Sequence, residues 1–144
     1  MPNTSVVCDA SFVLKLALKE EESQQAAEIW SAWAAGAVER CAPAVLWYEI
    51  ASALTNKVAR RILTAAEALN AFDALAPLAI SILAVPAFHR EAMNLAIQLH
   101  LRAAYDAHYL VLARSLDAEF WTADERLFNS VKDGFPLIHL LAPA

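Results

Sequence analysis

Four acidic residues stand beside apolar segments that could bring their carboxylates together: Asp9, Glu49, Asp106 and Asp124. Asp9 directly follows the apolar run Val-Val-Cys, whereas Glu49 and Asp106 are single acids inside Trp-Tyr-Glu-Ile and Ala-Tyr-Asp-Ala. An isolated charge in such surroundings is costly unless it is paired or bound to a metal ion. Neighbouring carboxylates repel each other, and hard divalent cations such as Mg²⁺ and Mn²⁺ prefer oxygen ligands. The pattern therefore predicts a divalent-cation site, whose chemistry would be the activation of water against a phosphodiester.

The segments that must position these acids alternate between two patterns. Short apolar runs predict strands at 4–8, 39–42, 80–85, 118–122 and 136–140. Longer stretches with helical periodicity or helix-capping residues predict helices at 12–19, 23–35, 43–60, 65–75, 88–99, 104–115 and 124–131. This alternation indicates an α/β fold, in which helices cover both faces of a parallel sheet. The sequence contains no linker, repeat or low-complexity segment, so we expect one domain over residues 1–144.

In such a fold the carboxyl ends of the strands and the amino ends of the helices share one edge, where ligands bind. Asp9 ends the first predicted strand, and Glu49 lies in the second turn of the helix after the second strand. Asp106 lies in the first turn of the helix before strand 118–122, and Asp124 follows that strand. Each acid alone could be a helix cap or a surface ion-pair partner. Their common edge favours one shared site.

Composition narrows the class of function. The chain has 144 residues, of which 59% are hydrophobic, and a formal net charge of −5. An acidic balance argues against a protein that coats nucleic acid through bulk charge, but it allows an enzyme that meets phosphate through bound cations. The only glycines are Gly36 and Gly134, and no dinucleotide-binding, P-loop or esterase motif is present.

Localisation is predicted from two absences, that of a membrane span and that of a signal peptide. The longest stretch without a charge, residues 74–88, is too short to span a bilayer and contains Pro77 and Pro86. The first eight residues lack the basic start and long apolar run of a signal peptide, so we expect a cytoplasmic protein without membrane contact. Cys8 and Cys41 have no metal-ligand spacing, and we expect both to be buried thiols, although a disulfide is possible if their strands are neighbours.

At these residues the chain resembles the PIN-domain family, and within it the VapC-type toxins of bacterial toxin–antitoxin pairs. The resemblance covers nearly the whole chain and rests on the order of its motifs: VCDAS at 7–11, Glu49 in an apolar helix, YDA at 105–107 followed by YLVLA, and TADERL at 122–127. It implies a three-layer α/β/α sandwich with a central parallel sheet of four or five strands. It also implies an endoribonuclease that depends on Mg²⁺ or Mn²⁺ and usually cuts structured RNA such as tRNA or rRNA. The implied partners are a second copy of the chain and a small antitoxin that blocks the site.

The resemblance carries roles to individual residues. Asp9, Glu49, Asp106 and Asp124 would be the metal-binding, catalytic acids, with Asp9 as the central ligand and Glu49 either binding metal or orienting water. Glu125 directly follows Asp124 and could replace it as a ligand. The small hydroxyl residues Ser11 and Thr122 match supporting positions beside the site, although helix capping would explain either one equally well.

Basic residues near the predicted site could hold RNA. Asn56 and Arg60 fall on the same side of the predicted helix as Glu49, and Lys57 and Arg61 flank them. This row predicts contacts to backbone phosphates. The alternative is a solvated helix end whose positive charges favour the helix dipole.

Two further pairs of residues allow weaker predictions. Lys15 and Lys19, one turn apart on the first predicted helix, could form a second phosphate row. Trp30 and Trp33 share an apolar helix face and are best interpreted as core. They could instead line a groove for an amphipathic antitoxin helix.

Two other classes of protein compete with a ribonuclease. A receiver-like phosphoacceptor is also an α/β protein with clustered acids, but it needs adjacent acids after the first strand, and Asp9 is followed by Ala10 and Ser11. The other alternative is a non-catalytic RNA- or protein-binding module that keeps the fold. The presence of all four acids argues against it.

Overall fold

A parallel sheet of five strands forms the centre of the computed structural model, which describes residues 4–142. The strand order is β3-β2-β1-β4-β5, and every pair of neighbours is parallel. The strands are β1 (Ser5–Cys8), β2 (Glu39–Pro43), β3 (Ser81–Leu83), β4 (Glu119–Thr122) and β5 (Ile138–Leu140). The predicted α/β class and the parallel sheet are confirmed. The single domain predicted over 1–144 includes residues 1–3 and 143–144, which lie outside the described residues.

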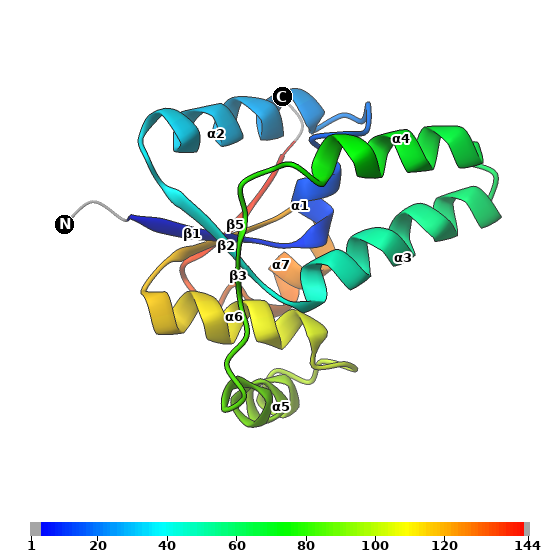
Figure 1. Ribbon diagram of the computed structural model, residues 1–144. Helices are drawn as coiled ribbons and strands as arrows, with labels where there is room; N and C mark the ends of the chain where they lie inside the picture. Colours follow the sequence, from blue (N-terminus) through cyan, green and yellow to red (C-terminus); the bar gives the residue numbers. More distant parts are fainter. Residues whose placement is uncertain (1–3, 143–144) are drawn as a thin grey trace.

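Helices pack on both sides of this sheet. They are α1 (Ala10–Leu14), α2 (Ser23–Ala35), α3 (Val45–Ala59), α4 (Ala65–Leu75), α5 (Phe88–Gln98), α6 (Tyr105–Leu116) and α7 (Glu125–Val131). In the view of Figure 1, α1 and α2 lie above the sheet, whereas α6 lies below it and α5 packs beneath α6. Helices α3 and α4 form a hairpin that extends beyond the strands. Along residues 4–142, no helix has both the length and the apolar character needed to cross a membrane.

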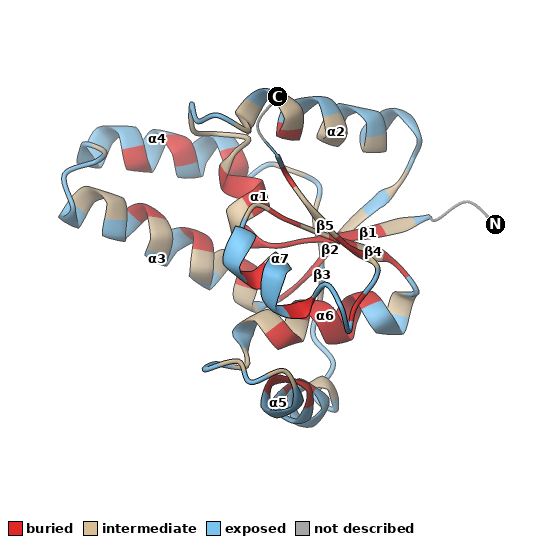
Figure 2. Ribbon diagram, turned by 180° about the vertical axis from the view of Figure 1, so that it is seen from behind, coloured by how far each residue is buried: buried red, intermediate tan, exposed pale blue. Residues whose placement is uncertain are grey.

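Burial is nearly complete along β1, the middle strand of the sheet. In β1, Val6, Val7 and Cys8 are buried, as expected for a strand covered on both faces. Val7 lies opposite Cys41 of β2 on one side and Phe120 of β4 on the other. Figure 2 shows the buried residues gathered along these strands and on the inner sides of the helices. Cys8 and Cys41 lie on neighbouring strands, and both are free, buried thiols.

The direction in which strands are added reverses at β1. The chain proceeds from β1 through β2 to β3 on one side, and β4 and β5 then follow on the other side of β1. In open α/β sheets, ligands bind at such a switch point, outside the carboxyl ends of the two strands. Here those two strands are β1 and β4, which are followed directly by Asp9 and by the turn that leads to Asp124.

Local signals account for most helix bounds. The predictions for α2 and α4 are confirmed residue for residue, and α4 begins with a capping box between Thr64 and Glu67. Pro43, predicted to open a helix, is instead the last residue of β2, and α3 begins at Val45. Proline can occupy this place because it need not donate a hydrogen bond at the end of a strand.

The first helix differs from its prediction. It was expected over 12–19 but runs from Ala10 to Leu14, because the Asp9 side chain caps it and the chain turns after Lys15. Lys19 therefore lies outside α1, and the predicted phosphate row of Lys15 and Lys19 is wrong. Lys15 instead forms ion pairs with Glu22, at 2.8 Å, and Glu20, at 3.5 Å.

The tryptophans of α2 belong to the edge of the core. Trp30 and Trp33 are half-buried and pack against the buried cluster, which confirms their interpretation as core. Trp33 stacks on Phe12 with 5.3 Å between ring centroids and meets the edge of Trp121 at 6.1 Å. These contacts attach α2 to α1 and to β4.

Candidate active site

Asp9 is the most deeply buried acid of the described chain and stands at the end of β1. Only 5% of the residue's surface is exposed. Oδ1 accepts hydrogen bonds from the Ser11 hydroxyl at 2.6 Å and from the Phe12 backbone N–H at 3.0 Å. Oδ2 accepts a hydrogen bond from the Thr122 hydroxyl at 2.6 Å. Asp9 is thus both the N-cap of α1 and the centre of a small polar network.

The two hydroxyls around Asp9 join the ends of β1 and β4. Ser11 accepts a hydrogen bond from the backbone N–H of Ala123 at 2.9 Å, and Thr122 accepts one from the N–H of Asp124 at 3.0 Å. Their oxygens lie 3.1 Å apart. Each hydroxyl has one hydrogen, which goes to the carboxylate. Ser11 and Thr122, predicted as supporting residues, therefore both contact Asp9 directly.

Glu49 is held from the opposite helix by a tyrosine. Glu49 lies in the second turn of α3, as predicted, and its Oε1 accepts a hydrogen bond from the Tyr109 hydroxyl at 2.6 Å. Tyr109 is fully buried in α6 and stacks on Phe120 of β4, with 5.8 Å between ring centroids. Sequence reasoning assigned Tyr109 no role. Its position three residues after Asp106 was the available signal, because this spacing places both on one face of α6.

Asp106 and Asp124 occupy helix starts on the same edge. Asp106 is half-buried in the first turn of α6. Asp124 is exposed and caps α7, where its Oδ1 accepts hydrogen bonds from the N–H groups of Arg126 at 3.0 Å and Leu127 at 3.1 Å. Glu125 is the first residue of α7 and is also exposed. The placement predicted for each acid relative to its strand or helix is therefore observed.

The electrostatics link all four acids through Asp106. Burial raises the pKa of Asp9 to about 7, against the hydrogen bonds from Ser11, Thr122 and Phe12, which lower it, and the charge of Asp106 raises it further. Burial also raises the pKa of Glu49, the Tyr109 hydrogen bond opposes this, and Asp106 again adds to the rise. The pKa of Asp106 itself is raised by burial and then by the charge of Asp124. The edge thus concentrates negative charge that no described basic side chain offsets.

The donor chemistry suits a hard divalent cation, although the ligands are not assembled around one point. Carboxylate oxygens from three separate helix or strand ends are the donors that Mg²⁺ and Mn²⁺ prefer. Within residues 4–142, however, no three Asp, Glu, His or Cys side chains are grouped closely enough to hold a metal ion together. Asp9, Glu49 and Asp124 each direct an oxygen to a protein donor instead. Ligation by Asp9 would compete with hydrogen bonds at both of its oxygens, whereas Glu49 and Asp124 each keep one oxygen outside these bonds.

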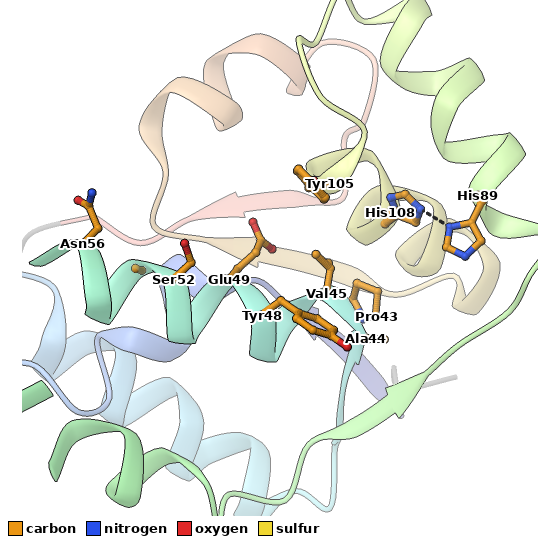
Figure 3. Close-up of a pocket in the computed structure, with 11 residues that line it drawn as sticks. Pro43, Ala44, Val45, Tyr48, Glu49, Ser52, Asn56, His89, Tyr105 and His108 are labelled. Atoms are coloured by element: carbon orange, nitrogen blue, oxygen red, sulfur yellow. Dashed lines mark hydrogen bonds between the residues drawn. The ribbon is translucent and has the colours of Figure 1, made fainter. Parts of the chain in front are cut away.

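A groove of about 940 Å³ opens beside Glu49. Figure 3 shows Glu49, Ser52 and Asn56 along one face of α3, with Tyr48 on the same helix and Tyr105 across from it at the start of α6. The groove was not foreseen from sequence. Its full lining is Pro43, Ala44, Val45, Tyr48, Glu49, Ser52, Ala53, Asn56, His89, Tyr105 and His108.

A pair of histidines closes one end of this groove (Figure 3). Nδ1 of His108 lies 2.6 Å from the carbonyl oxygen of Ala104, which can only accept, so this nitrogen carries the hydrogen. Nε2 of the same ring lies 2.9 Å from Nδ1 of His89, within hydrogen-bonding distance. His108 is thus directed to α5, in agreement with the helical spacing, which predicts that it faces away from Asp106.

The residues predicted to hold RNA separate in space. Asn56 lines the groove with Glu49, whereas Lys57 lines a different hollow together with Lys19, Glu20 and Glu67. Arg60 is the C-cap of α3, and Arg61 has a positive φ of 58°. Both arginines are exposed at the far end of α3. Their contact with RNA stays a prediction.

Comparison with known proteins supplies an independent observation. Among solved structures, a toxin–antitoxin complex from Klebsiella pneumoniae is similar, with a TM-score of 0.65 and 17% identity over 96% of this chain and 99% of that chain. PAE2754 from Pyrobaculum aerophilum is similar with a TM-score of 0.66 and 20% identity, over 89% of this chain and 80% of that chain. At these identities the likeness concerns the fold. No curated protein matches the sequence. The model of the PIN domain family matches residues 6–134.

Proposed function

Because this chain belongs to the PIN-domain family, we propose that it is a metal-dependent endoribonuclease and the toxin of a toxin–antitoxin pair. One observation supports the nuclease most directly. Asp9, Glu49 and Asp106 come from three separate parts of the chain that meet at the ligand-binding edge of the sheet, where burial raises the pKa of Asp9 and Glu49 and the charge of Asp106 adds to the rise. Uncompensated negative charge at such an edge favours the uptake of a divalent cation.

The proposed cation is Mg²⁺ or Mn²⁺, and its ligands are Asp9, Asp106 and either Asp124 or Glu125, with Glu49 as a ligand or as the residue that orients water. Such an ion supplies Lewis acidity, which neutralises charge on a phosphate and makes water a better nucleophile. The chain's own contribution is positioning. Ser11 and Thr122 hold the Asp9 carboxylate from two strand ends.

Tyr109 contributes to the same arrangement from the core. Its hydroxyl holds one oxygen of Glu49, and its ring is fixed on Phe120. This leaves the second oxygen of Glu49 available for the ion or for water. Because Glu49 also lines the groove, it connects the proposed metal site with the surface where RNA would lie.

The proposed partners follow the family and the solved structures. The similar protein from Klebsiella pneumoniae is described as a toxin–antitoxin complex. We extend this to the present chain as a proposal: a small antitoxin protein covers the site, and two copies of the chain form a homodimer. The proposed substrate is a structured RNA of the tRNA or rRNA class, cut in the cytoplasm.

The decisive experiment compares wild-type protein with Asp9→Asn on total cellular RNA. With Mg²⁺ or Mn²⁺ we expect cleavage into discrete fragments by the wild type only, and no cleavage by either protein in EDTA. Asp73→Asn, an exposed acid on α4 outside the site, is the matched control and should cleave like the wild type. Thermal unfolding would verify that Asp9→Asn is folded. Full activity of folded Asp9→Asn would refute the assignment.

The alternative of a non-catalytic binding module has one observation in its favour. Both oxygens of Asp9, and one oxygen each of Glu49 and Asp124, already accept hydrogen bonds from protein donors. A module of this kind would bind RNA or protein equally well in EDTA and in Mg²⁺ and would release no fragments. The same set of incubations therefore separates the two functions.

A further inference from the structure

We propose that the groove beside Glu49 is a subsite for an unpaired nucleobase of the RNA, which stacks on Tyr48 or Tyr105. This inference rests on the proposed ribonuclease function and adds the form of its substrate: the nucleotide next to the cut is single-stranded. Single-stranded RNA is commonly recognised through bases that stack on aromatic side chains and hydrogen-bond along their edges.

Two Tyr–acid pairs carry the inference. Tyr48 directly precedes Glu49 in α3, and Tyr105 directly precedes Asp106 in α6. Adjacent helical residues point about 100° apart, so each ring stands beside its carboxylate rather than behind it. Both tyrosines line the same groove, and so does Glu49 (Figure 3). Two proposed catalytic acids are therefore each accompanied by an aromatic ring at the groove.

The tyrosine rings are open to solvent. Tyr48 is 77% exposed and Tyr105 is 59% exposed, although many smaller apolar side chains of the chain are fully buried. A large aromatic surface left in water gains stability when a flat partner covers it. Neither ring packs against the buried core cluster. Binding of a ligand would explain their position.

The polar groups of the groove match a base better than a phosphate. None of the described residues that line it is Lys or Arg, and Glu49 would repel a phosphate there in the absence of a cation. Ser52 and Asn56 offer neutral donors and acceptors instead, and the two histidines add ring nitrogens. A nucleobase is flat, uncharged and edged with such groups. A peptide segment rich in acids or bases would find no opposite charge except Glu49.

The groove also has the right relation to the chemistry. Because Tyr48 adjoins Glu49 in α3 and both line the groove, a base stacked on Tyr48 would have its own sugar and phosphate close to Glu49. The subsite would then set which phosphodiester reaches the cation. Paired bases in a duplex cannot enter such a groove unless they leave their stack, so the subsite selects loops, bulges and ends.

The test measures binding without cleavage. Fluorescein-labelled hexauridylate and hexaadenylate are titrated in EDTA at low ionic strength, and anisotropy gives the dissociation constants for wild type, Tyr48→Ala and Tyr105→Ala. We expect at least one alanine variant to bind roughly tenfold more weakly, the order of one lost stacking contact. Tyr48→Phe and Tyr105→Phe keep the ring and should stay close to wild type. Leu69→Ala, an exposed apolar position on α4, is the matched control and should be unchanged.

An abasic nucleotide placed at each position of the hexamer in turn identifies the stacked base. At one position, removing the base should weaken binding to the wild type as much as the sensitive alanine substitution weakens binding of the intact hexamer. The alanine variant should then bind this abasic hexamer no more weakly than the wild type does. Additive losses at every position would overturn the subsite. So would equal binding by the wild type and both alanine variants, or no binding of either hexamer by the wild type.

Two further readouts separate this inference from its rivals. Size-exclusion chromatography of each variant shows whether the groove is an interface between copies, and loss of a dimer in Tyr48→Ala or Tyr105→Ala overturns the base subsite. Cleavage of total RNA in Mg²⁺ tests the proposed function separately. Wild-type cleavage that both alanine variants match would remove the subsite and leave the ribonuclease. Tyrosine-dependent binding without cleavage would leave the subsite and remove the ribonuclease.

Discussion

Tyr109 donates its hydroxyl hydrogen to Oε1 of Glu49 across 2.6 Å, and this bond joins two helices that are far apart in the sequence. Tyr109 belongs to α6 and Glu49 to α3. The bond therefore ties the hairpin of α3 and α4 to the helix that carries Asp106. A buried ring that reaches an acid at the edge of the sheet fixes the acid more firmly than solvent could.

Replacing Tyr109 with Phe should destabilise the protein and reduce cleavage. The stack on Phe120 survives, whereas Glu49 loses its donor, and a hydrogen bond to a charged group contributes about 1.5–3 kcal/mol. Because Glu49 is half-buried, we expect a loss near the lower figure, measured by urea unfolding. Tyr105→Phe is the control, since that tyrosine lies exposed. Equal stability of Tyr109→Phe and wild type would mean that the bond contributes nothing.

The stability of the metal-free protein should fall as pH rises. The pKa of Asp9 is raised from 3.8 to about 7, so the folded state holds a proton that the unfolded state releases. This contribution is complete below about pH 4 and is lost as pH rises through about 7. One pKa unit corresponds to about 1.4 kcal/mol, which sets an upper bound of about 4 kcal/mol.

Asp9→Asn isolates this contribution. The amide can accept from Ser11 and donate to Thr122, and Thr122 can then donate to Ser11, whose oxygen lies 3.1 Å away. Relative to the wild type, the variant should gain stability in EDTA, and the gain should be larger at pH 8 than at pH 5, where much of the wild-type contribution is still present. Thermal unfolding at both pH values provides the measurement. A difference between the two proteins that is the same at pH 5 and pH 8 would contradict the raised pKa.

Divalent cations should stabilise the wild-type protein at neutral pH. A ligand that binds only the folded state raises the unfolding free energy by RT ln(1 + [L]/Kd), which is about 2.7 kcal/mol at one hundred times Kd. We expect Mn²⁺ to raise the melting temperature of the wild type and of Asp73→Asn, but not that of Asp106→Asn. A rise of equal size in all three proteins would point to binding elsewhere on the acidic surface.

Thr122 can be tested through its hydroxyl alone. Thr122→Val keeps the shape of the side chain but removes the donor to Oδ2 of the buried Asp9 and the acceptor for the Asp124 N–H. An unsatisfied buried group costs about 1–3 kcal/mol, and the pKa of Asp9 should rise further because this bond lowers it. Thr122→Ser keeps the hydroxyl and should lose less. Equal stability of Thr122→Val and the wild type would mean that the hydroxyl contributes nothing.

Much of the fold was predictable because its signals are local. Helices α2 and α4 carry their own periodicity and end signals, so their bounds agree with prediction. Alternation of strands and helices was enough to place four acids on one edge. The first helix was misjudged because its end depends on Lys15, which pairs with Glu22 several residues later.

The interior of the site was less predictable because its contacts are distant in sequence. The Glu49–Tyr109 bond spans 60 residues and the Asp9–Thr122 bond spans 113. Spacing along one helix indicates which face a residue occupies but not which partner it meets across the sheet. For the same reason the groove formed by Tyr48 and Tyr105 was not foreseen, since its two walls come from α3 and α6.

Position 124 offers a way to separate scaffolding from chemistry. Both described bonds of the Asp124 cap end on Oδ1, so the start of α7 uses one oxygen of this carboxylate and leaves the other outside the cap. Asparagine is an equally good cap, whereas alanine is a poor one. Asp124→Asn therefore removes the charge and keeps the helix cap, whereas Asp124→Ala removes both. A single residue at the rim of the sheet can in this way report on architecture and on reactivity independently.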